Sequence, residues 1–213
     1  GRAAPDAGVD ASKLAVRVVP PTPGAVLKPC TGRTEGLVCC NLHVVTQTVG
    51  CPLDCAYCIL QAYQNREEIV VQAGAGTLLR RLEDELGRAP RRLRRVCTGQ
   101  VADSLALEPM AAFAERAVER FRGLDNAVLE LKTKTANVDL LLPLDHGGRT
   151  VVSFSLNPPA TARAEEHRAA PVEDRLAAAA RVARAGYLLA FHLDPMVTVD
   201  GDPAPFVALV ERI

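Results

Sequence analysis

The sequence predicts an α/β protein built as a partial, open parallel βα barrel with about five βα units. Strand-like apolar segments alternate with helical segments along most of the chain, which is the pattern of parallel strands joined by right-handed crossovers. Several predicted strands also alternate apolar with polar side chains, so the sheet would have one polar face. A closed eight-stranded barrel has an apolar interior and a flat parallel sheet is apolar on both faces, so an open, curved sheet fits better.

The chain divides into two parts by composition. Residues 1–40 are rich in Gly, Pro and Ala, with the run PPTPG at 20–24, and are expected to form an irregular N-terminal arm. Residues 41–213 carry the strand and helix patterns and are expected to form the barrel. A hydrophobic fraction of 48% can supply its core, which would be mainly Ala, Val and Leu because only 4% of the residues are aromatic.

The βα units start near residue 42, and glycines mark where two of their helices stop. One helical segment ends at Gly87 and another is stopped by Gly186, because glycine commonly terminates helices. The predicted strands are 42–48, 93–98, 127–133, 150–157 and 187–194. The predicted helices are a short one after residue 58, then 77–87, about 108–122, near 137–142, about 172–185, and from Pro203 to the end of the chain.

Side-chain parity assigns one face of the last three strands to the inside of the barrel. Alternate residues of a strand point to the same face, and the positions between them are apolar here. The inward set is Glu130, Lys132 and Lys134, then Ser153, Ser155 and Asn157, then Ala190, His192 and Asp194. The inside of the barrel is therefore predicted to be polar and wet.

Residues with useful chemistry also collect at the carboxyl ends of the predicted strands. Active sites of α/β folds lie at that edge, since the loops following parallel strands meet there. The residues at or just beyond the ends are Cys51, Gln100, Lys134, Asn157 and Asp194. Their arrival at one edge predicts an enzyme.

The loop after the first strand carries three cysteines, Cys51, Cys55 and Cys58, with the spacing CxxxCxxC in the run GCPLDCAYC. Thiolates are soft ligands suited to iron–sulfur clusters, zinc or copper. The motif contains no fourth ligand, so a cubane cluster bound here would keep one iron open. An open coordination position is also what separates catalytic from structural zinc sites, so this loop predicts chemistry rather than scaffolding.

The other cysteines leave two alternatives open. His43, Cys39 or Cys40 could complete a zinc site with the three-cysteine loop, and Cys30, Cys39 and Cys40 could hold a second metal. The chain has seven cysteines, an odd number, so disulfides are not expected. The N-terminal run lacks the apolar core of a secretory signal, and a cytoplasmic location is therefore expected. No apolar run approaches the ~20 residues needed to cross a bilayer. A formal net charge of zero gives no overall attraction to nucleic acid.

The cysteine loop, with Tyr57 just before its last cysteine, resembles the signature loop of the radical S-adenosylmethionine (SAM) enzymes. Within that superfamily the chain resembles the spore photoproduct lyase family, from about Lys28 to its end. The segments that carry the resemblance are KPC at 28–30, VCC at 38–40, GCPLDCAYCILQAY at 50–63, TGQVADSLALE at 98–108, KTKTANVDLLL at 132–142, SFSLN at 153–157 and GYLLAFHLDP at 186–195.

The resemblance implies a 4Fe–4S cluster on the three cysteines, whose open iron chelates SAM. Tyr57 would lie near the adenine, Lys134 would hold the SAM carboxylate, and Ser155, in the FSLN stretch, would contact the methionine part. Asn157, in the same stretch, is also expected to bind the cofactor. An inward lysine is costly unless an anion pairs with it, which independently favours the role given to Lys134. The family suggests reductive cleavage of SAM to a 5′-deoxyadenosyl radical that takes hydrogen from a thymine photoproduct in DNA, with an electron donor of the flavodoxin or ferredoxin type.

The sequence departs from the family pattern at two catalytic positions. Ile59 stands where the lyases have a second tyrosine, directly after the third cluster cysteine, and it cannot relay a hydrogen atom. An ungapped match on DSLALE places Gln100 where the lyases have their hydrogen-donating cysteine, whereas a gapped match on CTG would place Cys97 there. The alternatives are therefore a radical SAM enzyme with a non-DNA substrate, or a non-catalytic iron–sulfur or zinc module.

Further polar residues have a functional and a structural interpretation. His192 and Asp194 are expected either to bind substrate and transfer protons as a pair, or to form a hydrogen-bonded pair that only lines the barrel. Glu130 and Lys132 are expected to pair structurally, and Ser104 is expected to cap the next helix. The family continues beyond the fifth helix into a DNA-contacting tail, so the chain ending at residue 213 is expected to be a fragment or a shortened variant.

Overall fold

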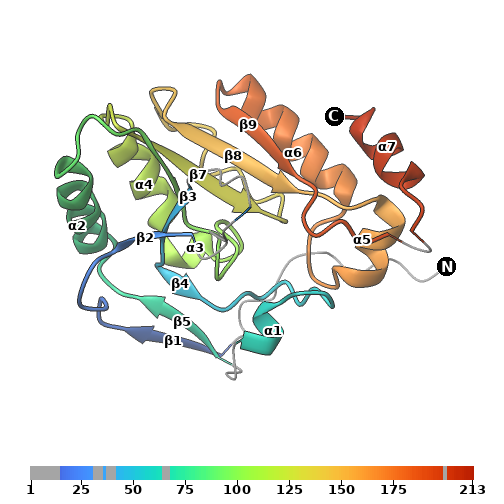
Figure 1. The fold of residues 1–213 in the computed structure, drawn as a ribbon, viewed down its shortest axis with the longest axis horizontal. Coiled ribbons are helices and arrows are strands. Elements are labelled where there is room, and N and C mark those ends of the chain that lie inside the picture. Colours follow the sequence, from blue (N-terminus) through green and yellow to red (C-terminus); the bar gives the residue numbers. More distant parts are fainter. Residues whose placement is uncertain (1–14, 31–35, 37–41, 64–67, 199–200) are drawn as a thin grey trace.

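The computed structural model describes residues 15–30, 36, 42–63, 68–198 and 201–213. Its larger sheet has the strand order β2-β3-β6-β7-β8-β9 (Figure 1). The strands are β2 (Leu27–Pro29), β3 (Leu42–Val45), β6 (Arg94–Cys97), β7 (Ala127–Thr133), β8 (Thr150–Ser155) and β9 (Leu188–His192). Neighbouring strands pair in parallel except β2, which is antiparallel to β3. The predicted open barrel with five parallel strands is confirmed.

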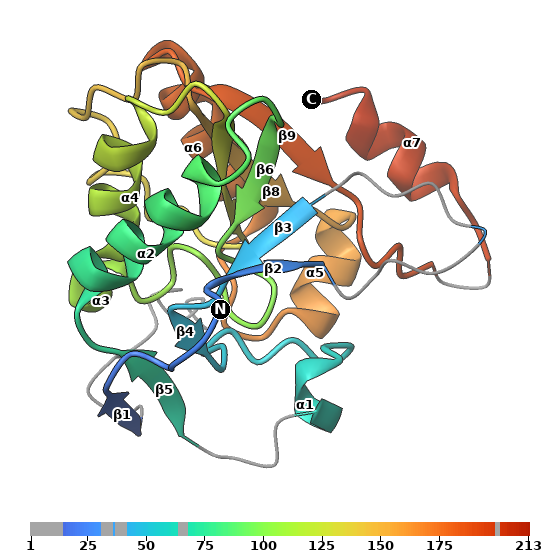
Figure 2. The ribbon, with the colours of Figure 1, turned by 60° about the vertical axis from the view of Figure 1, so that its left-hand side comes forward.

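The described residues form seven helices, three of which cover one side of this sheet. Their bounds, over the described residues, are α1 (Leu60–Tyr63), α2 (Ala75–Gly87), α3 (Glu108–Ala111), α4 (Phe113–Phe121), α5 (Pro159–Glu165), α6 (Val172–Arg184) and α7 (Ala204–Val210). Helix α4 packs on β7, α2 packs on α4, and α6 packs on β8 and β9, as Figure 2 shows from a second direction. Within the described ranges no helix combines the length and the apolar character needed to cross a membrane.

The apolar core lies between the helices and the sheet. Leu131 of β7 and Phe154 of β8 are fully buried there, together with Leu82, Phe121 and Val182 from the three covering helices. Burying one such side chain contributes about 1.5–3 kcal/mol to folding. The sequence predicted that Leu131 and Phe154 point to the apolar face of the sheet, and their burial beneath the helices confirms this.

The opposite face of the sheet is polar, as predicted. Ser153 Oγ of β8 donates a hydrogen bond to Glu130 Oε1 of β7 at 2.8 Å, and His192 Nε2 of β9 lies 2.8 Å from the same oxygen. Glu130 and Ser153 are fully buried, so hydrogen-bonded side chains rather than water fill this part of the interior. Open space begins further along, at the carboxyl ends of the strands.

A second, smaller sheet lies beside the first. It contains β1 (Val16–Val19), β5 (Ile69–Gln72) and β4 (Thr48–Val49) in the order β1-β5-β4. The expectation of irregular chain up to residue 40 is therefore wrong for β1, which pairs with β5, and for β2, which pairs with β3. Both strands are short and obtain their hydrogen bonds from distant segments, so local composition could not indicate them.

Several predicted element bounds also change. The strand expected over 42–48 is divided into β3 and β4, and β5 and α5 were not predicted. The helix expected over about 108–122 is broken at Ala112, whose φ of 44° lies outside the helical region. The helix expected near 137–142 is a series of turns, and the last helix ends at Val210.

Candidate active site

A cavity of about 500 Å³ opens at the carboxyl ends of the parallel strands. Its wall is formed by the cysteine loop after β4, by the loops that follow β6 and β7, and by the ends of β8 and β9. Of the residues predicted from the sequence, it is lined by Cys51, Cys55, Cys58, Tyr57, Gln100, Lys134, Ser155 and Asp194. The structure thus brings most of the predicted site into one cavity.

Backbone hydrogen bonds hold the cysteine loop from two sides. Gly50 N donates to Val101 O, in the loop after β6, at 3.0 Å. Ala56 N donates to Glu165 O, at the end of α5, at 2.7 Å. Gly50 has a φ of 104°, a conformation that favours glycine and lets the chain turn directly before Cys51. The loop is therefore fixed relative to both the second parallel strand and α5.

The three loop cysteines are free thiols that face the cavity. Burial raises the pKa of Cys55 to about 11 and also raises the pKa of Cys51. A coordinating metal removes the thiol proton, so such thiols still bind as thiolates. Among the described residues, no group of three His, Cys, Asp or Glu side chains is arranged to hold a single metal ion. Three thiols on one loop that face one cavity are a soft ligand set of the kind that iron–sulfur clusters use.

Glu166, which follows α5, is a charged residue that accepts hydrogen bonds from three side chains around the site. Its side chain is fully buried, and its Oε2 accepts a hydrogen bond from the guanidinium of Arg175 in α6. Its Oε1 accepts from the hydroxyl of Tyr57 and from Asn157 Nδ2, the latter at 3.2 Å. Burial alone would raise the pKa of Glu166, but the charges of Arg175 and Lys134 outweigh burial and lower it, so the carboxylate is ionised.

Lys134 stands directly after β7 with its side chain in the cavity wall. Its Nζ lies 3.6 Å from Glu166 Oε1 and 5.6 Å from the centre of the Tyr57 ring. The anionic partner that an inward lysine requires is thus present. Burial lowers the pKa of Lys134, and the charge of Glu166 opposes that effect.

Asp103 attaches the loop after β6 to the end of β7 through hydrogen bonds. Asp103 Oδ2 accepts from Lys134 N at 2.7 Å, and Oδ1 accepts from Thr133 Oγ1 at 2.8 Å. Gly99 approaches the same strand so closely that a Cβ there would stand 3.0 Å from Lys132 O. Ser104, expected to cap a helix, instead accepts from Lys132 N at 3.0 Å and from Thr98 Oγ1. Both polar residues therefore set the position of Lys134.

Two of the predicted catalytic residues lie outside the cavity. Cys97 is buried within the sheet, where burial raises its pKa to about 11, and its sulfur accepts from Gly99 N at 3.3 Å. His192 is bound to Glu130, as described above. Gln100, by contrast, lines the cavity, and its Nε2 lies 3.5 Å from Cys30 Sγ. Of the two candidate donor positions, Gln100 is therefore the one that faces the cavity.

The expected polar pairs are corrected by the structure. Glu130 does not pair with Lys132, because its Oε2 lies 2.5 Å from Arg95 Nε. Hydrogen bonds with His192, Arg95 and Ser153 lower the pKa of Glu130 to about 2 despite burial. Lys132 Nζ instead lies 3.9 Å from Asp194 Oδ2, at the cavity rim. Within the described part of the chain, His192 and Asp194 thus contact different partners rather than forming a pair.

The remaining predicted residues do not line the cavity or lie outside the described residues. Asn157 is fully buried behind Tyr57, whose hydroxyl its Nδ2 contacts at 3.3 Å, and it does not line the cavity. His43, a candidate zinc ligand, lies in β3 and does not line the cavity either. Cys39 and Cys40, the other candidates for zinc or a second metal, lie outside the described residues.

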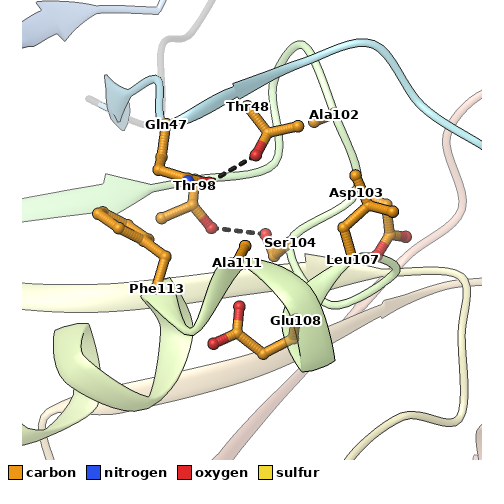
Figure 3. Close-up of a pocket in the computed structure, with 10 residues that line it drawn as sticks. All are labelled: Gln47, Thr48, Thr98, Ala102, Asp103, Ser104, Leu107, Glu108, Ala111 and Phe113. Carbon is orange, nitrogen blue, oxygen red and sulfur yellow. Dashed lines mark hydrogen bonds between the residues drawn. The ribbon is translucent and has the colours of Figure 1, made fainter. Parts of the chain in front are cut away.

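A second hollow of about 20 Å³ lies on the other side of the loop after β6, large enough for one water molecule. Figure 3 shows Glu108 and Phe113 on one side of it and Gln47 and Thr48 on the other. Glu108 Oε1 accepts from Glu115 N at the start of α4 at 3.1 Å, and burial raises the pKa of Glu108 to about 7. No cysteine lines this hollow, so the larger cavity is the candidate active site.

Sequence reasoning missed Glu166 and Arg175. Glu166 belongs to no recognised motif and follows a helix that was not predicted. Arg175 did carry a signal, because it occupies the same helical stripe as Val172, Ala179 and Val182, all of which are buried. A charged residue on an otherwise apolar stripe requires a buried partner, and that partner is Glu166.

An open parallel βα barrel with a CxxxCxxC loop at the carboxyl ends of its strands defines the radical SAM class of enzymes. The family model described as "Spore photoproduct lyase" matches residues 41–213. The chain therefore belongs to the spore photoproduct lyase family.

Relatives and solved structures agree with this assignment. The chain is 30% identical over 183 residues to spore photoproduct lyase of Bacillus subtilis, with 80% of this chain and 50% of that protein covered. It is 29% identical over 181 residues to the Geobacillus sp. enzyme, with the same coverage. A solved double mutant of spore photoproduct lyase "with bound AdoMet and dinucleoside spore photoproduct" superimposes with a TM-score of 0.81 and 25% identity, covering 93% of this chain and 56% of that one. The chain spans about half the length of the curated relatives it matches.

Proposed function

We propose that this chain is the SAM-cleaving part of a radical SAM enzyme and that it acts on a thymine photoproduct in DNA. The observation that carries the proposal is the shared cavity: three thiols, a partly buried lysine and an aromatic ring line one space at the carboxyl ends of the strands. The family match supplies the reaction class, and the solved relatives with AdoMet and dinucleoside spore photoproduct supply the ligands.

Cys51, Cys55 and Cys58 would hold a 4Fe–4S cluster, and SAM would bind beside it. When bound, the cluster would pass one electron to SAM and thereby release the 5′-deoxyadenosyl radical that takes hydrogen from substrate. Lys134 offers an ammonium group that can bind a carboxylate, and Tyr57 offers a ring face of the kind that stacks on adenine. Ser155, whose side chain lines the same cavity, offers a hydroxyl to the methionine part.

The proposal includes an external electron donor, of the flavodoxin or ferredoxin type, because cleavage of SAM consumes one electron. It also includes a cytoplasmic location. Thiols are kept reduced in that compartment, and the five described cysteines are all free. The cluster could therefore assemble on unoxidised ligands.

The substrate is the less constrained part of the proposal. Ile59 lines the cavity where the lyases carry a tyrosine, and Gln100 lines it at the position matched to their donor cysteine. Neither side chain can give up a hydrogen atom as a phenol or a thiol can. If a photoproduct is repaired here, a group other than these two returns the hydrogen.

Anaerobic incubation of the iron-reconstituted protein with dithionite and SAM tests the reaction class. The parent is expected to form 5′-deoxyadenosine, and Cys55→Ala is expected to lose both iron and product because the cluster loses one of its three thiolates. Cys97→Ala removes a buried cysteine outside the cavity and is expected to retain its iron. A parent that carries iron but forms no 5′-deoxyadenosine would favour a non-catalytic iron–sulfur module.

The substrate is tested by adding ultraviolet-irradiated DNA to the same mixture. Restored thymines, measured after digestion of the DNA, would support repair. 5′-Deoxyadenosine without any restored thymine, in the presence of confirmed photoproduct, would instead support a radical SAM enzyme acting on another substrate.

A further inference from the structure

The two carboxylate oxygens of Glu166 bind different parts of the protein: one contacts helix α6, and the other contacts residues at the cavity. Its Oε2 binds Arg175 of α6. Its Oε1 binds the Tyr57 hydroxyl and Asn157 Nδ2, and lies 3.6 Å from Lys134 Nζ. One buried carboxylate thus connects a helix on the outside of the sheet with the two residues that the proposed function gives to SAM.

Arg175 holds the scaffold oxygen in a fixed position. Its side chain is only 1% exposed, and its guanidinium donates to Ser155 O at 2.8 Å and to Ala170 O at 2.7 Å as well as to Glu166. A planar guanidinium with acceptors on every side cannot move without leaving buried groups unpaired. The position of Glu166 Oε1, and of what binds to it, is therefore set by the fold.

The backbone around Glu166 is also attached to the cysteine loop. Cys55 and Glu166 form an antiparallel β-bridge, and Ala56 N donates to Glu165 O at 2.7 Å. A displacement of Glu166 would consequently displace a cluster ligand together with Tyr57 and Lys134.

We propose that Glu166, held by Arg175, is a positioning residue for SAM: it fixes the Lys134 ammonium and the Tyr57 hydroxyl relative to the cysteine loop. The inference rests on the proposed function, since that function assigns Lys134 and Tyr57 to SAM. Glu166 acts through Lys134 and Tyr57 and does not itself touch SAM. It also supplies the counter-charge that keeps a buried ammonium group in the cavity wall before SAM binds.

The test compares Glu166→Gln with the parent after anaerobic iron reconstitution. Glutamine keeps the shape but removes the charge, so Lys134 loses its counter-ion. The variant is expected to load iron like the parent and to bind SAM about tenfold or more weakly by calorimetry, because truncating a buried charged contact acts mainly on affinity. Glu166→Asp, which retains the charge, is expected to recover part of the affinity. Glu108→Gln, a buried carboxylate outside the cavity, is the matched control and is expected to bind SAM like the parent.

A double-mutant cycle separates positioning from a general structural effect. In a Lys134→Met background Glu166→Gln is expected to cost much less affinity for SAM than it does alone, because the residue it acts through has gone. If Glu166→Gln does not fold, Glu166→Gln/Arg175→Met removes both buried charges and serves in its place.

The outcomes distinguish this inference from the proposed function. A parent that binds SAM and a Glu166→Gln variant that binds it equally well would overturn the inference alone. Equal losses in the parent and Lys134→Met backgrounds would also overturn it. A parent that carries a full cluster yet binds no SAM would overturn the proposed function and this inference together.

Discussion

At the scale of single residues, the polar side of the sheet is organised by three carboxylates, each held by several partners. Asp103 accepts backbone and hydroxyl hydrogen bonds, Glu130 binds Arg95 and His192, and Glu166 binds Arg175 and Lys134. The partners of Glu130 and Glu166 offset the cost of removing a charge from water and lower the pKa of each, whereas burial still raises the pKa of Asp103. These residues fix the ends of β7 and β8, and therefore the geometry of the cavity.

Glu108, like Asp103, is buried with hydrogen-bond donors but no cation among the contacts described. Burial raises its pKa from 4.5 to about 7, so the folded state favours the protonated form. Its contribution to stability is full below about pH 4.5 and is lost as the pH rises through about 7. Between these limits the parent is expected to lose about 3 kcal/mol of unfolding free energy relative to Glu108→Gln.

Urea unfolding of the metal-free parent and of Glu108→Gln, at a series of pH values, measures this difference. The stability curves are expected to diverge with rising pH, the variant becoming the more stable of the two. Two curves that stay parallel from mildly acid to mildly alkaline pH would show that Glu108 titrates normally.

At the scale of elements, helix α2 secures the antiparallel edge strand of the large sheet. Glu85 Oε1 accepts from Val26 N and Oε2 accepts from Leu27 N, both at 2.9 Å. A hydrogen bond to a charged group contributes about 1.5–3 kcal/mol to the free energy of unfolding. Strand β2 contains only three residues, so the helix rather than the ladder supplies much of its attachment.

Glu85→Ala is accordingly expected to increase the hydrogen exchange of the Val26 and Leu27 amides and to lower the unfolding free energy by about 1.5–3 kcal/mol. Glu83→Ala, on the same helix, removes an exposed ion pair of 3.4 Å with Arg120 and is expected to cost about 0–1 kcal/mol. Equal protection of the two amides in both variants would show that β2 is held by its ladder alone.

The elements that the sequence predicted share one property: their pattern is local. The parallel strands alternate apolar and polar residues, and α2 and α6 end at or next to glycines, so both could be predicted from consecutive residues. Strands β1, β2 and β5 could not, because they are three or four residues long and depend on partners far away in the chain. The break at Ala112 has no counterpart in the apolar pattern of 108–122.

The same distinction applies to the site. Cys51, Cys55 and Cys58 were predicted from spacing, and Lys134 from strand parity, because both are properties of neighbouring residues. Glu166 was not predicted, since its role comes from Arg175, Tyr57 and Lys134 meeting only in the folded chain. Strand parity predicted that His192 and Asp194 lie on the same face of the sheet. It could not predict which residues they contact, because those partners come from other strands.

At the scale of the whole molecule, one face of an open sheet is packed with helices and the other ends in a cavity lined by three thiols. The family assignment covers residues 41–213, which include every lining residue named above. The central claim is that these thiols hold a four-iron cluster with one iron free to bind SAM.

Electron paramagnetic resonance of the dithionite-reduced, iron-reconstituted protein, recorded with and without SAM, tests this claim most directly. The account predicts about four irons per chain and the signal of a reduced 4Fe–4S cluster whose g values change when SAM is added. A fully loaded cluster with the same spectrum in the presence and absence of SAM would contradict it, as would a colourless anaerobic protein containing zinc.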